Sequence, residues 1–183
     1  MAVDVFDDVY PYETFRVISD ACCHSPFLIG WQEGAKYQTD VSDAQLGCLH
    51  SKWIWNKEAH CDWPEFHPKE DLVGKTENSK IKEFVNNREP TTAVVNLVDS
   101  SGTYTCHVHP GFDVMLVYAN VEWRRDWGGE TLFYDDKAVD LVKAIEPRPN
   151  RVALFSGDTP HSIRPSSTIS PKFRFSVTMM FEK

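Results

Sequence analysis

The segment Phe173-Arg-Phe-Ser-Val-Thr-Met-Met-Phe181 alternates strictly between two kinds of side chain. Because successive side chains of a β-strand point to opposite faces, its odd-numbered positions would form one apolar face. The other face would carry Arg174 and Ser176. An arginine turned away from water needs an anionic partner, since an unpaired buried charge is costly. A carboxylate ligand held by the guanidinium group and the Ser176 hydroxyl would satisfy it.

Short strands of this kind fill the chain after Pro90, separated by Gly, Pro, Asn and Asp turns. Their number and even spacing predict a sandwich or barrel-like β fold. Helices are predicted before them, over 12–21 and 78–87, and the segment 47–67 is predicted to form a strand and then a loop that could act as a lid. The predicted strands cover 92–99, 103–109, 113–120, 130–134, 139–145, 151–155, 161–164 and 173–181.

A chain of 183 residues is long enough for one domain with a substantial core. We expect a single domain over 1–183, in which 1–90 form a helical and mixed support or lid region and 91–183 form the β core. The formal net charge of −8 disfavours nucleic acid as a partner, because nucleic-acid binding relies on Lys and Arg. An acidic protein of this kind favours a small-molecule or peptide substrate.

The cellular setting predicted from the sequence is the cytoplasm. The longest uncharged apolar stretch, Val114 to Ala119, is too short to span a membrane, and the acidic N-terminal residues do not form a secretion signal. The five cysteines are odd in number, and Cys22 and Cys23 are adjacent, so they make a poor disulfide framework. That pattern suits a reducing compartment. The oligomeric state is left open.

Three histidines are the candidates for metal binding. A strand over 103–109 would place His107 and His109 on the same side. A third imidazole, His161, follows the apolar strand Val152-Ala-Leu-Phe155. Three ligands brought together from two strands are what a facial metal site requires, because the opposite positions stay open for substrate and oxygen.

Several motifs of this chain jointly resemble one family. They are Tyr104-Thr-Cys-His-Val-His109, Leu116-Val-Tyr-Ala-Asn-Val-Glu-Trp123, Trp127-Gly-Gly-Glu-Thr-Leu-Phe-Tyr134, Pro149-Asn-Arg-Val-Ala-Leu-Phe155, His161 and Arg174-Phe-Ser176. In order and spacing they resemble the iron(II)/2-oxoglutarate-dependent oxygenases, and within them the prolyl-hydroxylase-like branch. The resemblance covers roughly 92–181.

The resemblance implies a mainly β (α+β) protein with flanking helices and a double-stranded β-helix core, also described as jelly-roll or cupin-like. It implies a dioxygenase that uses Fe(II), 2-oxoglutarate as cosubstrate and O2, and releases succinate and CO2. The expected reaction is hydroxylation of a prolyl or other amino-acyl residue, or of a small amino-acid-like substrate.

The same resemblance implies roles for particular residues. His107 would be the proximal iron ligand and His161 the distal one. Arg174 would anchor the far carboxylate of 2-oxoglutarate, and Ser176 completes the Arg-x-Ser form of that anchor. Tyr104 matches a tyrosine that often lines the cosubstrate pocket. Asn96, on the preceding strand, could reach the inner carboxylate.

One position departs from the family pattern, because His109 stands where the family has an acid. In the interpretation that we prefer, His109 is the third ligand, which gives a neutral three-histidine site. Alternatively, Asp113 supplies the carboxylate. In a third interpretation His109 is the proximal ligand and Gly111 replaces the acid, as in the halogenases of the family.

Two other kinds of function remain open. The first is a three-histidine cupin-type dioxygenase that does not use 2-oxoglutarate, against which the Arg174 anchor argues. The second is a binding module that has lost catalysis, for which the missing acid argues.

Overall fold

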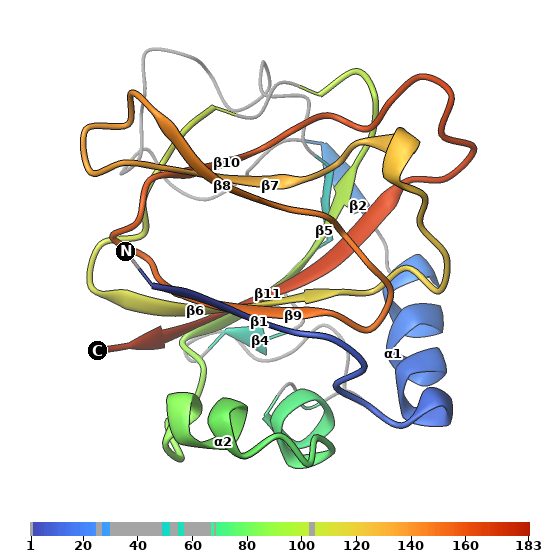
Figure 1. Ribbon diagram of the computed structural model, residues 1–183. Helices are drawn as coiled ribbons and strands as arrows, with labels where there is room; N and C mark the ends of the chain where they lie inside the picture. The colour runs from blue at the N-terminus through green and yellow to red at the C-terminus, as the bar shows by residue number, and fades with distance from the viewer. Residues whose placement is uncertain are drawn as a thin grey trace.

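The structure is a computed structural model that describes residues 2–24, 27–29, 49–51, 55–56, 67, 69–102 and 105–183. Its strands form two sheets that face each other (Figure 1). The larger sheet has eight strands in the order β1-β9-β6-β11-β5-β3-β2, with β4 also paired to β5, and the smaller has the order β10-β7-β8. This is a double-stranded β-helix. The strands are β1 (Val3–Phe6), β2 (Phe27–Ile29), β3 (Leu49–Ser51), β4 (Trp55–Asn56), β5 (Thr92–Val98), β6 (Phe112–Tyr118), β7 (Thr131–Tyr134), β8 (Leu141–Ile145), β9 (Val152–Ser156), β10 (His161–Ile163) and β11 (Arg174–Glu182).

Two separate hydrophobic cores cover the two faces of the larger sheet. One face packs against α1 (Tyr12–His24), α2 (Ser79–Val85) and a short π-helix (Lys69–Gly74), which lie on the side away from the smaller sheet in Figure 1. The opposite face forms the core between the two sheets, where Phe133 of β7 packs against Phe155 of β9. The N-terminal helices therefore support the sheet from behind and leave its inner face to the site.

The predicted helices are present with slightly different ends. The first runs from Tyr12 to His24, three residues beyond the prediction. The second begins after Asn78, whose side chain accepts hydrogen bonds from the Lys80 and Ile81 amides and so caps the helix. It ends at Asn86, which adopts the left-handed conformation that commonly terminates helices.

The alternation predicted for 173–181 is confirmed for the buried part of that strand. Val177, Met179 and Phe181 belong to the core beneath the helices. Arg174 and Ser176 are fully buried and lie on the other face. Since β11 is central, with β6 on one side and β5 on the other, its even-numbered side chains extend into the space between the sheets.

Several elements differ from the prediction, including β2 and the π-helix Lys69–Gly74, which it did not contain. In the described part of 103–109 the backbone is not a strand, because only His107 forms a bridge, with His161. The adjoining turn at Pro110 and Gly111, where Gly111 has φ +82°, ends any regular pairing there. The prediction missed β1, which pairs with β9 at the edge of the larger sheet. Of 47–67, only 49–51, 55–56 and 67 are described.

An ion pair fastens the end of β1 to the sheet. The Arg151 guanidinium donates to both carboxylate oxygens of Asp7, at 2.6 and 2.9 Å. Arg151 is buried, whereas the Asp7 side chain is 45% exposed. The hydrogen bond from Arg151 lowers the pKa of Asp7 below its usual value, although burial opposes this.

We predict that Asp7→Asn lowers the melting temperature at pH 7 modestly, by the equivalent of about 1 kcal/mol or less, since Asp7 is half-exposed. A carboxyl group with a lowered folded pKa stabilises the protein above its unfolded pKa of ~3.9, and this contribution disappears as the pH falls through the folded pKa. Thermal unfolding followed at pH 7 and at pH 3 checks this. A difference between wild type and variant that does not shrink toward pH 3 would exclude the carboxylate charge as its source.

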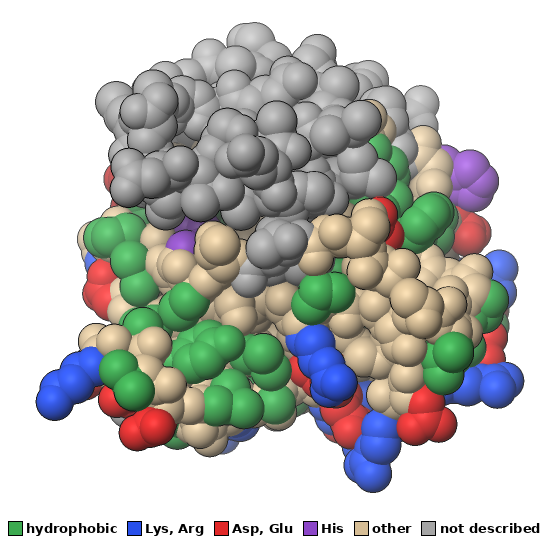
Figure 2. Space-filling view, turned by 90° about the horizontal axis from the view of Figure 1, so that it is seen from above, with side chains coloured by type: hydrophobic (Ala, Val, Ile, Leu, Met, Phe, Trp, Pro, Cys, Tyr) green, Lys and Arg blue, Asp and Glu red, His purple; other side chains and the backbone are tan. Residues whose placement is uncertain are grey.

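On the face drawn in Figure 2, the basic side chains stand beside acidic ones around the rim, and hydrophobic side chains gather at the lower left. Opposite charges that alternate in this way make no continuous basic stripe on the described part of that face. Among the described residues, no helix has the length and apolar character needed to cross a membrane.

Candidate functional site

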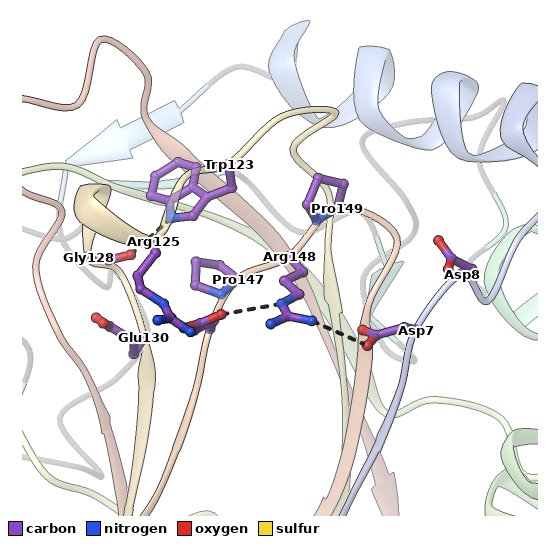
Figure 3. A pocket seen from close by; sticks show the side chains of 10 residues that line it. Asp7, Asp8, Trp123, Arg125, Gly128, Glu130, Pro147, Arg148 and Pro149 are labelled. Atoms are coloured by element: carbon purple, nitrogen blue, oxygen red, sulfur yellow. Dashed lines mark hydrogen bonds and ion pairs between the residues drawn. The ribbon is translucent and has the colours of Figure 1, made fainter.

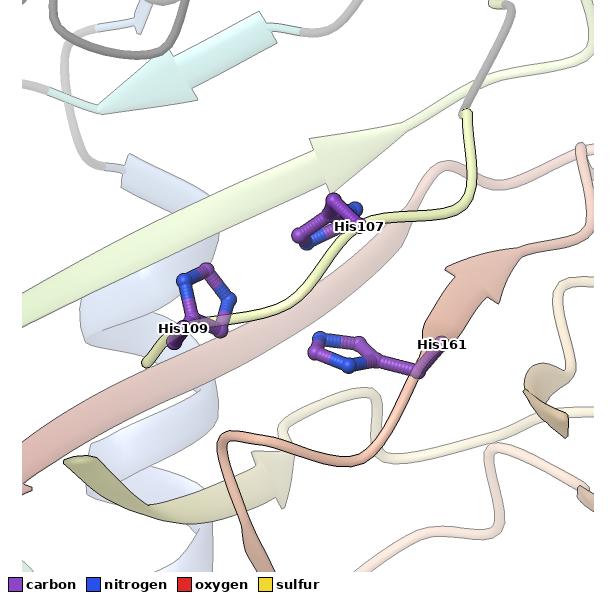
Figure 4. Close-up of side chains that lie close together, drawn as sticks. All are labelled: His107, His109 and His161. Atoms are coloured by element: carbon purple, nitrogen blue, oxygen red, sulfur yellow. The ribbon is translucent and has the colours of Figure 1, made fainter. Parts of the chain in front are cut away.

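Three imidazole rings converge between the two sheets. His107 and His109 come from the segment before β6, and His161 begins β10 (Figure 4). One possible ligand atom of each lies within 4.8 Å of the others. The ring centroids are 4.5 to 5.2 Å apart. The structure therefore brings together the three histidines that the sequence singled out.

Main-chain hydrogen bonds hold the two histidine segments against each other. The amide of His107 donates to the carbonyl of His161 at 2.9 Å, and the amide of His161 returns a bond of 3.0 Å. The amide of His109 donates to the Gly157 carbonyl at 2.7 Å. Each ring is thus positioned by its own backbone.

Local carbonyl groups set the tautomers of two of these rings. Nδ1 of His107 lies 2.9 Å from the Thr105 carbonyl oxygen, and Nδ1 of His161 lies 2.8 Å from that of Thr159. A carbonyl oxygen only accepts, so each Nδ1 carries the hydrogen. Nε2 of both rings therefore has a free lone pair for a metal. Metal-binding histidines usually donate their other ring N–H to a carbonyl or carboxylate in the same way.

The cluster is kept uncharged by its surroundings. Burial, together with the neighbouring imidazoles, lowers the pKa of His161 to about 3 and that of His109 to about 4. His107 is the exposed member of the cluster, and partial desolvation of its ring lowers its pKa in the same direction. Phe133 and Phe155 contribute to this environment, with ring centroids 6.0 and 5.0 Å from that of His161. Three neutral imidazoles are a donor set that suits iron, as it also suits zinc, copper and nickel.

The other candidates for the third ligand lie elsewhere. The carboxylate of Asp113 pairs with Arg88 at 2.8 Å, and the cluster found among the described residues does not include it. Gly111 lies in the turn that follows the cluster. The interpretation that gives Gly111 the position of the acid leaves out His107, although the His107 ring lies closer to the His161 ring than the His109 ring does.

Arg174 forms a second polar centre inside the fold. Its side chain is fully buried, and its guanidinium donates to the hydroxyls of Ser176 at 3.2 Å and Thr131 at 3.1 Å. The guanidinium carbon also lies 5.0 Å from the centre of the Tyr118 ring, whose hydroxyl is 2.7 Å from that of Thr131. Both hydroxyls bonded to Arg174 are neutral, and both belong to the space between the sheets.

The two centres are close along one strand. In the smaller sheet His161 pairs with Phe133, and Thr131, which binds Arg174, lies two residues earlier in the same strand. Two residues of β-strand extend over ~6.7 Å. The residue that pairs with His161 and the residue that binds Arg174 therefore lie one strand repeat apart on β7.

Two weaker predictions have different outcomes. Asn96 is opposite Ser176 in the sheet, is buried, and donates to the Thr178 hydroxyl at 2.9 Å. It thus belongs to the same polar row as the arginine anchor. Tyr104 lies outside the described residues.

The sequence analysis missed Thr131 and Tyr118. Their signal was weak, because a lone threonine or tyrosine in a short strand is ordinary. Only the alternation of β7, in which Thr131 and Phe133 are both buried, points to an inward position for Thr131.

Gly157 is in close contact with His109, the candidate for the third ligand. A Cβ atom at this position would overlap the carbonyl oxygen of His109 and lie 2.8 Å from that of Phe112. We predict that Gly157→Ala lowers the affinity for iron(II) about 10- to 100-fold, the range typical of residues that orient metal ligands. Metal titration against a competing chelator measures this. Gly74→Ala, whose Cβ would meet only the Lys69 carbonyl oxygen at 3.7 Å, is the control. Equal affinities in the two variants would contradict the prediction.

Comparison with solved structures shows the same fold in several proteins. A prolyl-4-hydroxylase from Pseudomonas putida aligns with a TM-score of 0.65 and 17% identity, over 99% of this chain and 92% of that one. A prolyl hydroxylase from Trichoplax adhaerens, in complex with a hypoxia inducible factor oxygen degradation domain peptide fragment, aligns with a TM-score of 0.66 and 17% identity, over 98% and 83%. An oxidoreductase of the 2OG-Fe(II) oxygenase family from Burkholderia pseudomallei aligns with a TM-score of 0.64 and 10% identity, over 98% and 85%.

Comparison of the sequence itself identifies the family. No curated protein matches this chain. The family model described as the 2OG-Fe(II) oxygenase superfamily matches residues 93–182, which contain β5 to β11, the histidine cluster and Arg174. Members of this family use iron(II), 2-oxoglutarate and O2, and the three-histidine cluster fits the iron. Through its double-stranded β-helix, residues 93–182, this chain belongs to the 2OG-Fe(II) oxygenase superfamily.

Proposed function

We propose that this protein hydroxylates a prolyl or other amino-acyl residue of a peptide, or a small amino-acid-like molecule, with His107, His109 and His161 as its iron ligands. One observation carries the proposal, namely that three neutral imidazoles converge at the strand position paired with His161, two residues along β7 from the threonine that binds a fully buried arginine. That separation suits a five-carbon diacid with one end at the metal and the other at Arg174.

The group that the histidines would hold supplies the oxidation chemistry: with 2-oxoglutarate and O2, iron(II) provides the oxidant for a C–H bond, and succinate and CO2 are released. The protein contributes position and electrostatics. Nε2 of His107 and of His161 is oriented by the carbonyl group that each Nδ1 contacts. Phe133 and Phe155 pack against the His161 ring and exclude water from that side.

Arg174 would hold the far carboxylate of 2-oxoglutarate. Its two hydroxyl partners, Ser176 and Thr131, fix the direction of the guanidinium and can themselves donate to the same carboxylate. Asn96 lies beside Ser176 and would line the same pocket. Three neutral ligands leave the double charge of iron(II) undiminished, which strengthens its attraction for a dianion.

A peptide is the first substrate class to test, because the Trichoplax adhaerens protein of the same fold was solved with a bound peptide. In the experiment, the purified protein is mixed anaerobically with iron(II) and 2-oxoglutarate, and the absorption of the chelated complex is recorded. Oxygen is then admitted with a proline-containing peptide library or with free amino acids. We expect the absorption band, succinate, and a mass gain of one oxygen atom in one of the two substrate classes.

Two results would count against this proposal. A protein that binds iron(II) without a 2-oxoglutarate-dependent band or succinate would instead have the properties of a three-histidine dioxygenase. A protein without iron affinity would be a binding module. In either case the roles given to Arg174 and the histidines would have to be revised.

A further inference from the structure

Gly129 lies where the main chain crosses the side chain of Arg174. A Cβ atom built at this glycine would lie 3.1 Å from Cδ of Arg174 and 3.1 Å from Cζ2 of Trp123. Pro147 would be 3.6 Å away. Gly129 also has φ +80°, a conformation that favours glycine. Residue 129 is thus in close contact with the stem of the arginine on one side and an indole ring on the other.

Neither of these neighbours has much freedom to move. Arg174 is fully buried, its backbone is paired within β11, and its guanidinium is hydrogen-bonded to Ser176 and Thr131. The indole of Trp123 donates to the Gly128 carbonyl at 2.9 Å and packs edge-on against Trp127. A side chain at position 129 would therefore push against two groups that are each held at several points.

We propose that Gly129 is a positioning residue for 2-oxoglutarate: the absence of a side chain there lets Arg174 keep its guanidinium at the depth where it meets the far carboxylate. This inference rests on the function proposed above for Arg174. Any added Cβ shifts the arginine stem by a few tenths of an ångström, which misaligns hydrogen bonds whose strength depends steeply on geometry.

An added side chain at Gly129 could instead be accommodated on its outer side, away from Arg174. Trp123 and Pro147, which face Gly129, also line a cleft of about 510 Å³ on the protein surface (Figure 3). Arg125, Glu146 and Arg148 cross this cleft in a chain of ion pairs. If the indole moved toward the cleft, it would absorb the added methyl group, and Arg174 would stay in place.

The neighbouring glycine is a matched control. Gly128 also has a positive φ, +67°, so alanine is strained at both positions. A Cβ at Gly128, however, would meet the Pro165 carbonyl oxygen at 3.0 Å and the Ser167 amide at 3.4 Å, and Arg174 is not among its near neighbours. The two variants share the backbone strain and differ in the contact with the arginine.

The experiment measures the dissociation constants of 2-oxoglutarate and of 2-oxobutyrate for the iron(II)-loaded protein by anaerobic calorimetry. 2-Oxobutyrate has the metal-binding end but no far carboxylate. We expect Gly129→Ala to weaken 2-oxoglutarate binding about tenfold and Gly128→Ala to change it less than twofold, and neither to change 2-oxobutyrate binding. Equal effects of Gly129→Ala on both ligands, or equal effects of the two alanine variants on 2-oxoglutarate, would overturn the proposal.

Two further measurements separate this inference from the function on which it rests. If Arg174→Gln leaves 2-oxoglutarate binding unchanged, the anchor itself is wrong. If Arg174→Gln weakens binding while Gly129→Ala matches Gly128→Ala, only the role of Gly129 is wrong. In the double variant Gly129→Ala/Arg174→Gln, we expect no loss beyond that of Arg174→Gln. If Gly129→Ala alone unfolds at the assay temperature, the contact is structural and the proposal fails.

Discussion

Replacing His109 by alanine is expected to lower the affinity for iron(II) at least ~100-fold, whereas Asp113→Asn should leave it unchanged. Removing a ligand should cost at least as much as removing a group that only orients one, which typically costs 10- to 100-fold. His109 is one of the three imidazoles whose nitrogen atoms lie within 4.8 Å of one another. Asp113 is held by Arg88 at 2.8 Å. Competition titrations with a metal chelator, on the wild type and both variants, measure the two affinities.

Asp113→Asn also serves as the folding control for this experiment. It removes a partly exposed ion pair, which contributes ~1 kcal/mol at most, so its circular dichroism and melting temperature should stay close to those of the wild type. A large loss of iron affinity in Asp113→Asn, with His109→Ala little affected, would show that the acid is the third ligand. The turn at Pro110 and Gly111 would then have to rearrange on metal binding.

His109→Asp distinguishes the charge of the third ligand from its position. The variant has the acid that is typical of the family at this position, so it should retain iron. Its carboxylate lowers the net charge of the metal site by one unit. We therefore expect weaker attraction for the 2-oxoglutarate dianion and a shifted absorption band in the complex, both recorded in the same anaerobic titration.

The sequence analysis singled out Arg174 and Ser176 because they lie in a strongly patterned strand. In β11 both faces are buried, so a polar residue such as Arg174 in an apolar alternation marks an inward-facing functional position. His107, His109 and His161 also come together as predicted, although the strand predicted over 103–109 does not form. The segment around His107 is held by a single bridge and not by a strand, yet the two amide–carbonyl bonds of that bridge still bring the rings together.

What the sequence did not predict depends on contacts between residues far apart in the chain. Thr131 acts on Arg174 from the opposite sheet, and nothing in its local pattern identifies that partner. The pairing of β1 with β9 was missed for the same reason. It joins segments near the two ends of the chain, and the ion pair that supports it, between Asp7 and Arg151, also connects residues far apart in the sequence. The close contact of Gly157 with His109 is another case, since it becomes visible only when the turns are placed in space.

Replacing Arg174 by glutamine is expected to weaken 2-oxoglutarate binding by about 2–5 kcal/mol, which is roughly 30- to 4,000-fold. Glutamine is shorter and neutral, so it offers neither the charge nor the two-pronged donor geometry that a carboxylate prefers. Iron(II) affinity should not change, because the guanidinium donates to Ser176 and Thr131, and among the described residues no hydrogen bond joins it to the histidines. Anaerobic calorimetry, first with iron(II) and then with 2-oxoglutarate, separates the two steps.

A second buried arginine provides the control for this variant. Arg151 is also buried but pairs with Asp7 at the edge of the sheet, so Arg151→Gln should lower the melting temperature and leave 2-oxoglutarate affinity unchanged. Arg174→Gln should keep its melting temperature and lose 2-oxoglutarate affinity. Taking a guanidinium out of water costs several kcal/mol, so its removal need not destabilise the protein, while the added stability that 2-oxoglutarate provides would be lost. If both variants lost stability and 2-oxoglutarate affinity in parallel, Arg174 would be a structural residue and the cosubstrate would be bound elsewhere.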